Sequence, residues 1–200
     1  MGTISEVLAL ESTQDADVFA GPAIPSQIER TFGGQVAAQA LAAAQRTVDN
    51  KQVHSLHGYF VGPGDTKKPL ELRVERLRDG RSFASRQVRV IQDGRLVFIM
   101  LASFHRDGDA GPEHQDVAPQ VLSPDEAARR GGGAPYSTRI ILKEWTDWDI
   151  RLVPDEGRDD AAAEVTGAGY RHIWFRNTGE LGSDPAFHRA ALTYMSDMTL

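Results

Sequence analysis

One segment of the sequence, Gly34–Val48, constrains the fold more than any other. Six of its first eleven residues are alanine, which has the highest intrinsic helix propensity of all residues. Val36, Ala40, Ala44 and Val48 recur at every fourth position and therefore fall on one face of a helix. Alanine is also small, so we expect this helix to approach a sheet closely.

The residues around this segment mix or alternate apolar and polar side chains, which is typical of strands that are buried on one face. Residues 8–20 predict a first strand, and His54–Val61 predicts a second. Leu70–Phe104 predicts a three-stranded meander. The sequence therefore favours an α+β unit in which an antiparallel sheet wraps the alanine-rich helix.

Two Asp-Gly pairs, Asp79-Gly80 and Asp93-Gly94, separate the strands of the meander. Asp-Gly favours a tight type I′ hairpin turn, because both central positions need a positive φ. The third strand contains the apolar run Leu96–Ala102, which does not alternate. We therefore expect this strand to be central in the sheet and covered on both faces.

The chain then changes composition. Residues 107–137 are rich in Gly, Pro, Asp and Ala, and Gly131–Gly133 marks their most flexible point. Within them, Ser123–Glu126 (Ser-Pro-Asp-Glu) forms a capping box with proline at the first helical position, which predicts a short helix. This composition indicates a linker.

The pattern of the first half recurs after the linker. Trp148–Val153 and Tyr170–Asn177 predict strands, and Asp184–Thr199 predicts a helix with a good N-cap residue. The remaining strands of this second unit are absent, so we expect it to be incomplete. We predict three parts: a first unit over residues 1–106, a linker over 107–137 and the start of a second unit over 138–200.

The composition excludes several classes of function. The 200 residues include no cysteine, which excludes disulfides, thiolate catalysis and cysteine zinc sites. No apolar run approaches the ~20 residues of a membrane-spanning helix, and the acidic start lacks the basic region of a secretory signal. The net charge of −6 argues against a general nucleic-acid partner. We therefore expect a cytoplasmic protein.

Four segments together resemble one known family. RTFGGQVAAQAL, HSLHGYFVGPGD, RDGRSFASRQV and HRAALTYMSD are similar to sequences of type II acyl-CoA thioesterases, the TesB-like double-hotdog enzymes. The resemblance implies two hotdog units, each an antiparallel sheet wrapped around a central helix. It implies hydrolysis of fatty acyl-CoA to free fatty acid and CoA by direct attack of water, a reaction of fatty acid metabolism. It also implies a homo-oligomer joined through the sheets, with no cofactor or metal, because CoA is part of the substrate.

The resemblance also assigns a catalytic residue. In the family, an Asp near the end of the second helix holds the attacking water together with a Thr or Ser and a Gln. The sequence Tyr194–Asp197 matches that context, so Asp197 inherits the role. Without the resemblance, Asp197 is interpreted as an acid on the exposed side of a helix. The family's Thr and Gln belong to later strands that this sequence lacks, so the alternative function is an inactive or partner-dependent subunit that binds acyl-CoA.

The absence of common nucleophile motifs from the sequence is consistent with hydrolysis by direct attack of water. Hydrolysis by water needs a general base and a donor for the oxyanion, and it needs no covalent nucleophile. The sequence contains no cysteine and no G-x-S-x-G motif. A hydratase or dehydratase of the same fold would carry a D-x-N-x-x-H arrangement, which is also absent.

Two histidines lie in the segment HSLHGYF. His57 is a second catalytic candidate, because a histidine in this context has been considered catalytic in the family. His54 and His57 are three positions apart, so on a regular strand they would point to opposite faces and share no metal site. Each is otherwise interpreted as an ordinary strand histidine.

Gly34 and Gln35 open the alanine-rich helix and are candidates for substrate binding, because glycine permits close approach of an acyl or CoA group. The interpretation that we favour is structural: glycine also permits tight packing of a helix against a sheet. Tyr59 is the third substrate-binding candidate. The opposing expectation places four aromatic residues in the core: Tyr59, Phe60, Phe98 and Phe104.

Overall fold

The computed structural model describes residues 1–108, 111–130, 142–154 and 172–198. Its contacts divide the chain into two compact units. The first unit combines Met1–Asp109 with Leu181–Leu200, and the second is Ala110–Glu180. The segment at the C-terminal end of the chain thus belongs to the same unit as the N-terminal half.

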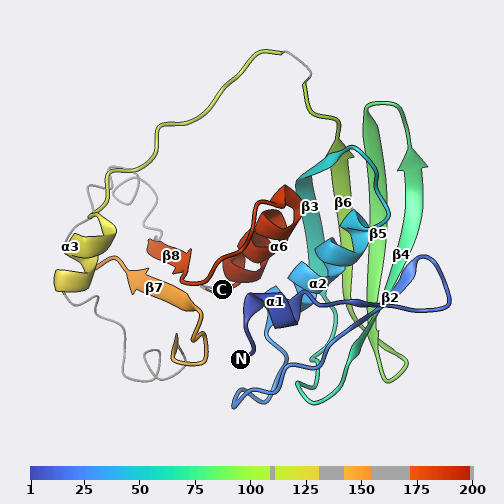
Figure 1. Cartoon of the computed structure of the whole chain (residues 1–200), viewed down its shortest axis with the longest axis horizontal. Helices are drawn as coiled ribbons and strands as arrows, with labels where there is room; N and C mark the ends of the chain where they lie inside the picture. The colour runs from blue at the N-terminus through green and yellow to red at the C-terminus, as the bar shows by residue number, and fades with distance from the viewer. Residues whose placement is uncertain (109–110, 131–141, 155–171, 199–200) are drawn as a thin grey trace. The chain divides into compact units, whose positions relative to one another are not determined.

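The first unit is built on a six-stranded antiparallel sheet with the strand order β1-β2-β4-β5-β6-β3. One face of the sheet, here called the inner face, packs against helix α2 (Gly33–Gln45), and the opposite face is called the outer face. Helix α6 (Pro185–Ser196) lies beside α2 (Figure 1). The strands are β1 (Glu11–Ser12), β2 (Val18–Gly21), β3 (Gln52–Phe60), β4 (Leu70–Asp79), β5 (Phe83–Gln92) and β6 (Arg95–His105).

The predicted alanine-rich helix is confirmed as α2, although it ends at Gln45 rather than Val48. Ala40, Leu41 and Ala44 are buried in one cluster with apolar residues of the inner face, such as Val88 and Met100. Small side chains on the helix allow this close packing, and burial of the apolar surface provides the main stabilisation of the unit.

The single strand predicted over residues 8–20 is wrong. The structure has helix α1 (Ile4–Val7), which Thr3 and Glu6 cap reciprocally, and then two short strands, β1 and β2. A turn separates these strands, because the Thr13 hydroxyl accepts from the N–H of Asp15 and donates to the carbonyl of Val18. This local hydrogen bonding competes with a continuous strand.

The predicted meander is confirmed as β4, β5 and β6, but its two turns differ. Asp93 and Gly94 have φ of 52° and 74°, as a type I′ turn requires. Asp79 and Gly80 have no positive φ, and the Gly80 N–H bonds to the carbonyl of Phe83 across a longer connection. The type I′ prediction for Asp79-Gly80 is therefore wrong.

Strand β6 lies between β5 and β3, as its apolar run predicts. It is not covered on both faces within the described part of the chain: Met100 is buried on the inner face, whereas Leu101 on the outer face is 49% exposed. The outer face of β6 is thus an apolar surface that the described residues leave partly open.

The second unit contains helix α3 (Pro124–Arg129) and the antiparallel strands β7 (Trp148–Leu152) and β8 (Ile173–Asn177). The capping box predicted for α3 is confirmed, because Ser123 and Glu126 cap each other's backbone N–H groups. Gly131–Gly133 lies outside the described residues. The predicted division into residues 1–106, 107–137 and 138–200 remains a prediction. The structure places α6 in the same unit as α2 rather than with β7 and β8.

A buried arginine fixes the C-terminal end of α2 to the sheet. Arg86, on β5, is 1% exposed and donates Nε to the hydroxyl and Nη2 to the carbonyl of Thr47, just beyond α2. The same guanidinium donates to the carbonyls of Arg78 and Ser85 and pairs with Asp79 at 2.6 Å. These bonds compensate for burial of the charge, which is unfavourable without partners.

We expect Arg86→Met to lower the free energy of unfolding by about 2–4 kcal/mol, because several buried acceptors lose their donor. Urea unfolding measures this. Arg89→Met is the matched control: Arg89 is on the same strand, exposed on the outer face, and we expect a change within about 0.5 kcal/mol. Equal losses in the two variants would contradict a structural role for the buried guanidinium.

Candidate active site

Asp197 and Gly34, two of the predicted site residues, are in contact. Asp197 follows the last residue of α6, and its Oδ2 accepts a hydrogen bond of 2.9 Å from the backbone N–H of Gly34. Phe32 occupies the N-cap position of α2 and gives no side-chain cap hydrogen bond. The carboxylate of Asp197 therefore caps α2 from another helix, a position that the helix dipole favours for an anion.

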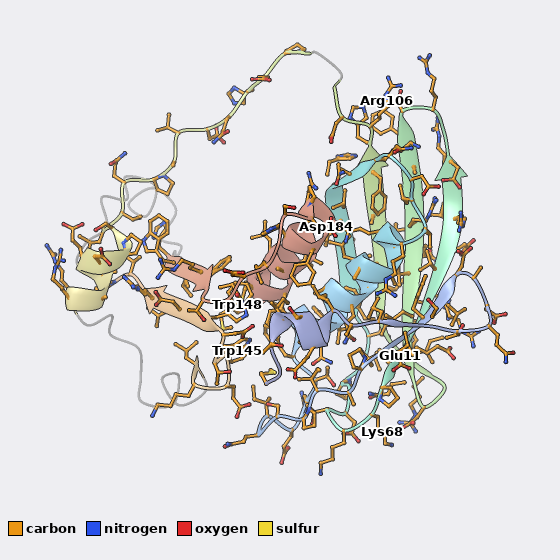
Figure 2. All side chains as sticks on the ribbon, in the orientation of Figure 1. Glu11, Lys68, Arg106, Trp145, Trp148 and Asp184 are labelled. Carbon is orange, nitrogen blue, oxygen red and sulfur yellow. The ribbon has the colours of Figure 1, made fainter. Side chains whose placement is uncertain are left out.

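Local sequence explains how α6 holds Asp197 there. Asp184 begins the helix by accepting a hydrogen bond of 2.9 Å from the N–H of Ala186, with proline at the first helical position (Figure 2). The predicted N-cap is thus confirmed. Near the other end of α6, the Tyr194 ring meets the Phe32 ring edge to face, with centroids 5.1 Å apart. This contact and the N–H of Gly34 together orient the end of α6.

The two glycines at the start of α2 are required by close contacts. A Cβ at Gly34 would collide with the backbone carbonyl oxygen of Tyr194, so this glycine allows α6 to approach α2. A Cβ at Gly33 would lie 2.6 Å from Asp197 Oδ2 and 2.8 Å from the ring of Phe60. These contacts favour the structural interpretation of the two glycines: Gly34 meets the backbone of α6, and Gly33 meets both Asp197 and Phe60 of β3.

Burial and one hydrogen bond act in opposite directions on Asp197. Partial burial raises the pKa of this carboxyl above its ordinary value, because the charged form loses hydration. The hydrogen bond from Gly34 lowers the pKa by stabilising the carboxylate, and burial is the larger effect. A carboxyl with a raised pKa is a stronger base than an exposed aspartate.

Asp197 lines a pocket of about 380 Å³ between the start of α2 and the end of β3. Its apolar wall is formed by Val36, Phe60, Val61 and Val97. Arg30 and Thr31 line the same pocket, together with the segment 62–64. The pocket therefore combines one basic carboxylate with an apolar surface.

His57 lies on the other side of the sheet. It pairs with Leu101 and its ring meets that of Tyr59, both on the outer face, whereas Asp197 and α2 lie at the inner face. A β-bulge between Val53 and Ser55 also turns His54 to the outer face, where its Nε2 contacts the Ser103 hydroxyl at 2.8 Å. The prediction of opposite faces for the two histidines is wrong, because the bulge changes the alternation.

The remaining candidates are also separated from the pocket. Gln35 is buried and its Nε2 donates to the carbonyl of Pro22 at 3.4 Å. Tyr59 is 65% exposed and Phe60 is 54% exposed, so the core prediction fails for both and holds for Phe98 and Phe104. The sequence pattern predicts no site role for Phe60, and the one signal for it is the Gly-Pro-Gly segment that begins two residues later and lines the same pocket.

The described part of the chain shows no group of three or more His, Asp or Glu side chains that could hold a metal ion. Among the same residues, no helix is long and apolar enough to cross a membrane. The pocket is thus lined by the Asp197 carboxylate, the polar side chains of Arg30 and Thr31 and apolar side chains.

Comparison with known proteins identifies the family to which this chain belongs. Residues 22–105 match the acyl-CoA thioesterase N-terminal domain family. The chain is 30% identical to acyl-CoA thioesterase 2 of Haemophilus influenzae over 202 residues, which cover 98% of this chain and 70% of that protein. The chain belongs to the acyl-CoA thioesterase II family.

Solved structures extend this relationship to the fold. Acyl-CoA thioesterase II TesB2 from Mycobacterium marinum superposes with a TM-score of 0.79 at 39% identity, over 99% of this chain and 69% of that chain. A protein from Alicyclobacillus acidocaldarius, described as having a hot dog fold, gives a TM-score of 0.73 at 23% identity, over 100% of this chain and 70% of that chain. The predicted hotdog fold is therefore confirmed.

The match to mammalian members of the family is shorter. Human acyl-coenzyme A thioesterase 8 is 43% identical over 124 residues, which are 62% of this chain and 39% of that protein. The chain thus matches less than half of the length of this relative.

We expect Gly34→Ala to destabilise this acyl-CoA thioesterase family member by at least about 2 kcal/mol, because the added methyl group forces α6 away from α2. Thermal unfolding measures the loss. Gly62→Ala is the control, since a Cβ there meets nothing nearer than 3.7 Å. A tolerated Gly34→Ala would show that α6 does not pack on α2 as closely as described.

Proposed function

We propose that this protein hydrolyses fatty acyl-CoA to free fatty acid and CoA, with Asp197 as the general base. One observation carries the proposal: the Asp197 carboxylate, held by the Gly34 N–H, lies in a pocket with an apolar wall. The wall suits an acyl chain, and the carboxylate suits activation of water beside its thioester. Membership of the acyl-CoA thioesterase II family supports the same activity.

The reaction needs only water and the carboxylate. Asp197 takes a proton from the water as the water oxygen bonds to the thioester carbonyl carbon, and the carbonyl electrons move to its oxygen. The resulting oxyanion then collapses and the C–S bond breaks. The departing sulfur takes the proton from Asp197, which restores the carboxylate and releases CoA and the fatty acid.

The start of α2 stabilises the negative charge during this sequence. Backbone N–H groups and the positive end of the helix dipole lie there, where an oxyanion gains most from fixed donors. In the resting state the Gly34 N–H bonds to the Asp197 carboxylate. Once Asp197 is protonated, it holds that N–H less strongly, and the N–H becomes a donor for the oxyanion.

The proposal extends to the cofactor, the location and the oligomeric state of the protein. The proposed reaction uses no cofactor. The absence of cysteine fits a reducing compartment, which supports a cytoplasmic location. The partly exposed apolar residues on the outer face, such as Leu101 and Tyr59, support a homo-oligomer formed through the sheets.

We expect Asp197→Asn to reduce CoA release from palmitoyl-CoA by about 10²–10⁴-fold, because the amide accepts no proton from water. A thiol-reactive dye measures the released CoA. Asp184→Asn is the matched control: it removes the same charge from the other end of α6, and Asn still caps the helix. Full activity of Asp197→Asn, combined with loss of activity in His57→Ala, would reassign the base to the histidine.

We expect kcat/KM to decrease as the pH is lowered (the acid limb of the pH–rate profile), with a midpoint above the ordinary pKa of aspartate. The sign follows from the raised pKa of Asp197: the base works when ionised, and it becomes protonated as the pH falls through that raised value. A pH–rate profile at constant ionic strength measures the limb. Asp184→Asn should leave the midpoint of this limb unchanged. A shift of the midpoint in Asp184→Asn would show that the limb does not report the titration of Asp197.

A further inference from the structure

Phe60 has an unusual place for a large apolar side chain. It is the last residue of β3 and pairs with Phe98, which is buried on the inner face, yet Phe60 itself is 54% exposed. Both Phe60 and Asp197 line the pocket of about 380 Å³. The exposed surface of this ring is therefore available to a molecule that enters the pocket.

The ring and the carboxylate face each other across Gly33. A single point, the position of a Cβ on Gly33, lies 2.6 Å from Asp197 Oδ2 and 2.8 Å from the Phe60 ring. Any side chain at this position would separate the two groups. Glycine thus leaves the Phe60 ring and the Asp197 carboxylate close to one point with no side chain of residue 33 between them.

The ring is held in this place by its own strand and by β6. The Phe60 and Phe98 rings lie 4.7 Å apart at an interplanar angle of 37°. A Cβ on Gly58 would collide with the Phe98 ring, so the absence of a side chain there gives Phe98 room to lie beneath Phe60. The Phe60 ring therefore packs against Phe98 and also lines the pocket.

We propose that Phe60 is the residue that selects the acyl group, because its ring contacts the acyl carbons next to the thioester while it shields the Asp197 carboxylate from water. This inference rests on the proposed function. The ring offers the apolar surface nearest to the base, so a chain bound on it presents its carbonyl carbon to water at Asp197. The same ring removes hydration from one side of the carboxylate, and burial is the main cause of the raised pKa of Asp197.

Among the described residues, few charged groups near the Asp197 carboxylate compete with this effect. From α2, the groups at the carboxylate are Gly33 and the N–H of Gly34, and β3 contributes Phe60. The segment before α2 contributes Arg30, the one charged residue besides Asp197 in the described lining of the pocket. Arg30 is exposed, and no interaction with it contributes to the pKa of Asp197.

The test compares Phe60→Ala with Phe83→Ala in the full chain. Phe83 is a matched control because it is an aromatic residue at the start of β5, 45% exposed on the outer face. For Phe60→Ala we expect kcat/KM with palmitoyl-CoA to fall about tenfold or more through KM, with a smaller change for acetyl-CoA. We expect its acid limb to move to lower pH. Phe60→Leu, which keeps an apolar side chain, should restore most of both properties.

A second measurement does not depend on turnover. Carboxyl ¹³C NMR follows the titration of Asp197 directly, and Phe60→Ala should lower its pKa whereas Phe83→Ala should not. If wild-type protein hydrolyses palmitoyl-CoA but Phe60→Ala matches Phe83→Ala in KM and in both titrations, the role of Phe60 is overturned while the proposed function stands. If wild-type protein releases no CoA, the proposed function fails, and an unchanged Asp197 titration in Phe60→Ala then overturns the shielding as well.

Discussion

The hydrogen bond from the Gly34 N–H to Asp197 joins the start of α2 to the end of α6. It depends on the close approach of α6 to α2, which in turn depends on the missing side chain at Gly34. The carboxylate also replaces a side-chain cap that α2 lacks at Phe32. Helix packing, helix capping and the position of the Asp197 carboxylate are therefore linked in one arrangement.

Much of this fold could be predicted from the sequence because its signals are local. The alanine stripe of α2, the alternation in β4 and β5, and the caps at Ser123 and Asp184 each lie within a few neighbouring residues. The short elements before α2 could not be predicted in this way, because their composition resembles one strand. The hydrogen bonds of Thr13 divide this segment into two short strands. A side chain that forms hydrogen bonds with the nearby backbone can thus override the strand propensity of a segment.

The site could be predicted only in part. The resemblance to a family predicts a catalytic role for Asp197, but spacing could not show that Asp197 touches Gly34, because 163 positions separate them. A bulge in β3 placed His54 and His57 on one face, and no residue pattern in this segment announces that bulge. Phe60 was assigned to the core because apolar residues are usually buried, whereas its position at the end of β3 leaves it exposed.

Partial burial of the Asp197 carboxyl works against stability once this group is ionised. The pKa of Asp197 is higher in the folded chain than its ordinary value, so the folded state binds this proton more tightly than the unfolded state does. The free energy of unfolding therefore falls as the pH rises between the two pKa values, so ionisation of Asp197 in the folded state is accompanied by a loss of stability. The N–H of Gly34 limits this loss, because it stabilises the carboxylate that burial disfavours. A partly dehydrated carboxylate at this position is thus stabilised by the donor that the first turn of α2 places beside it.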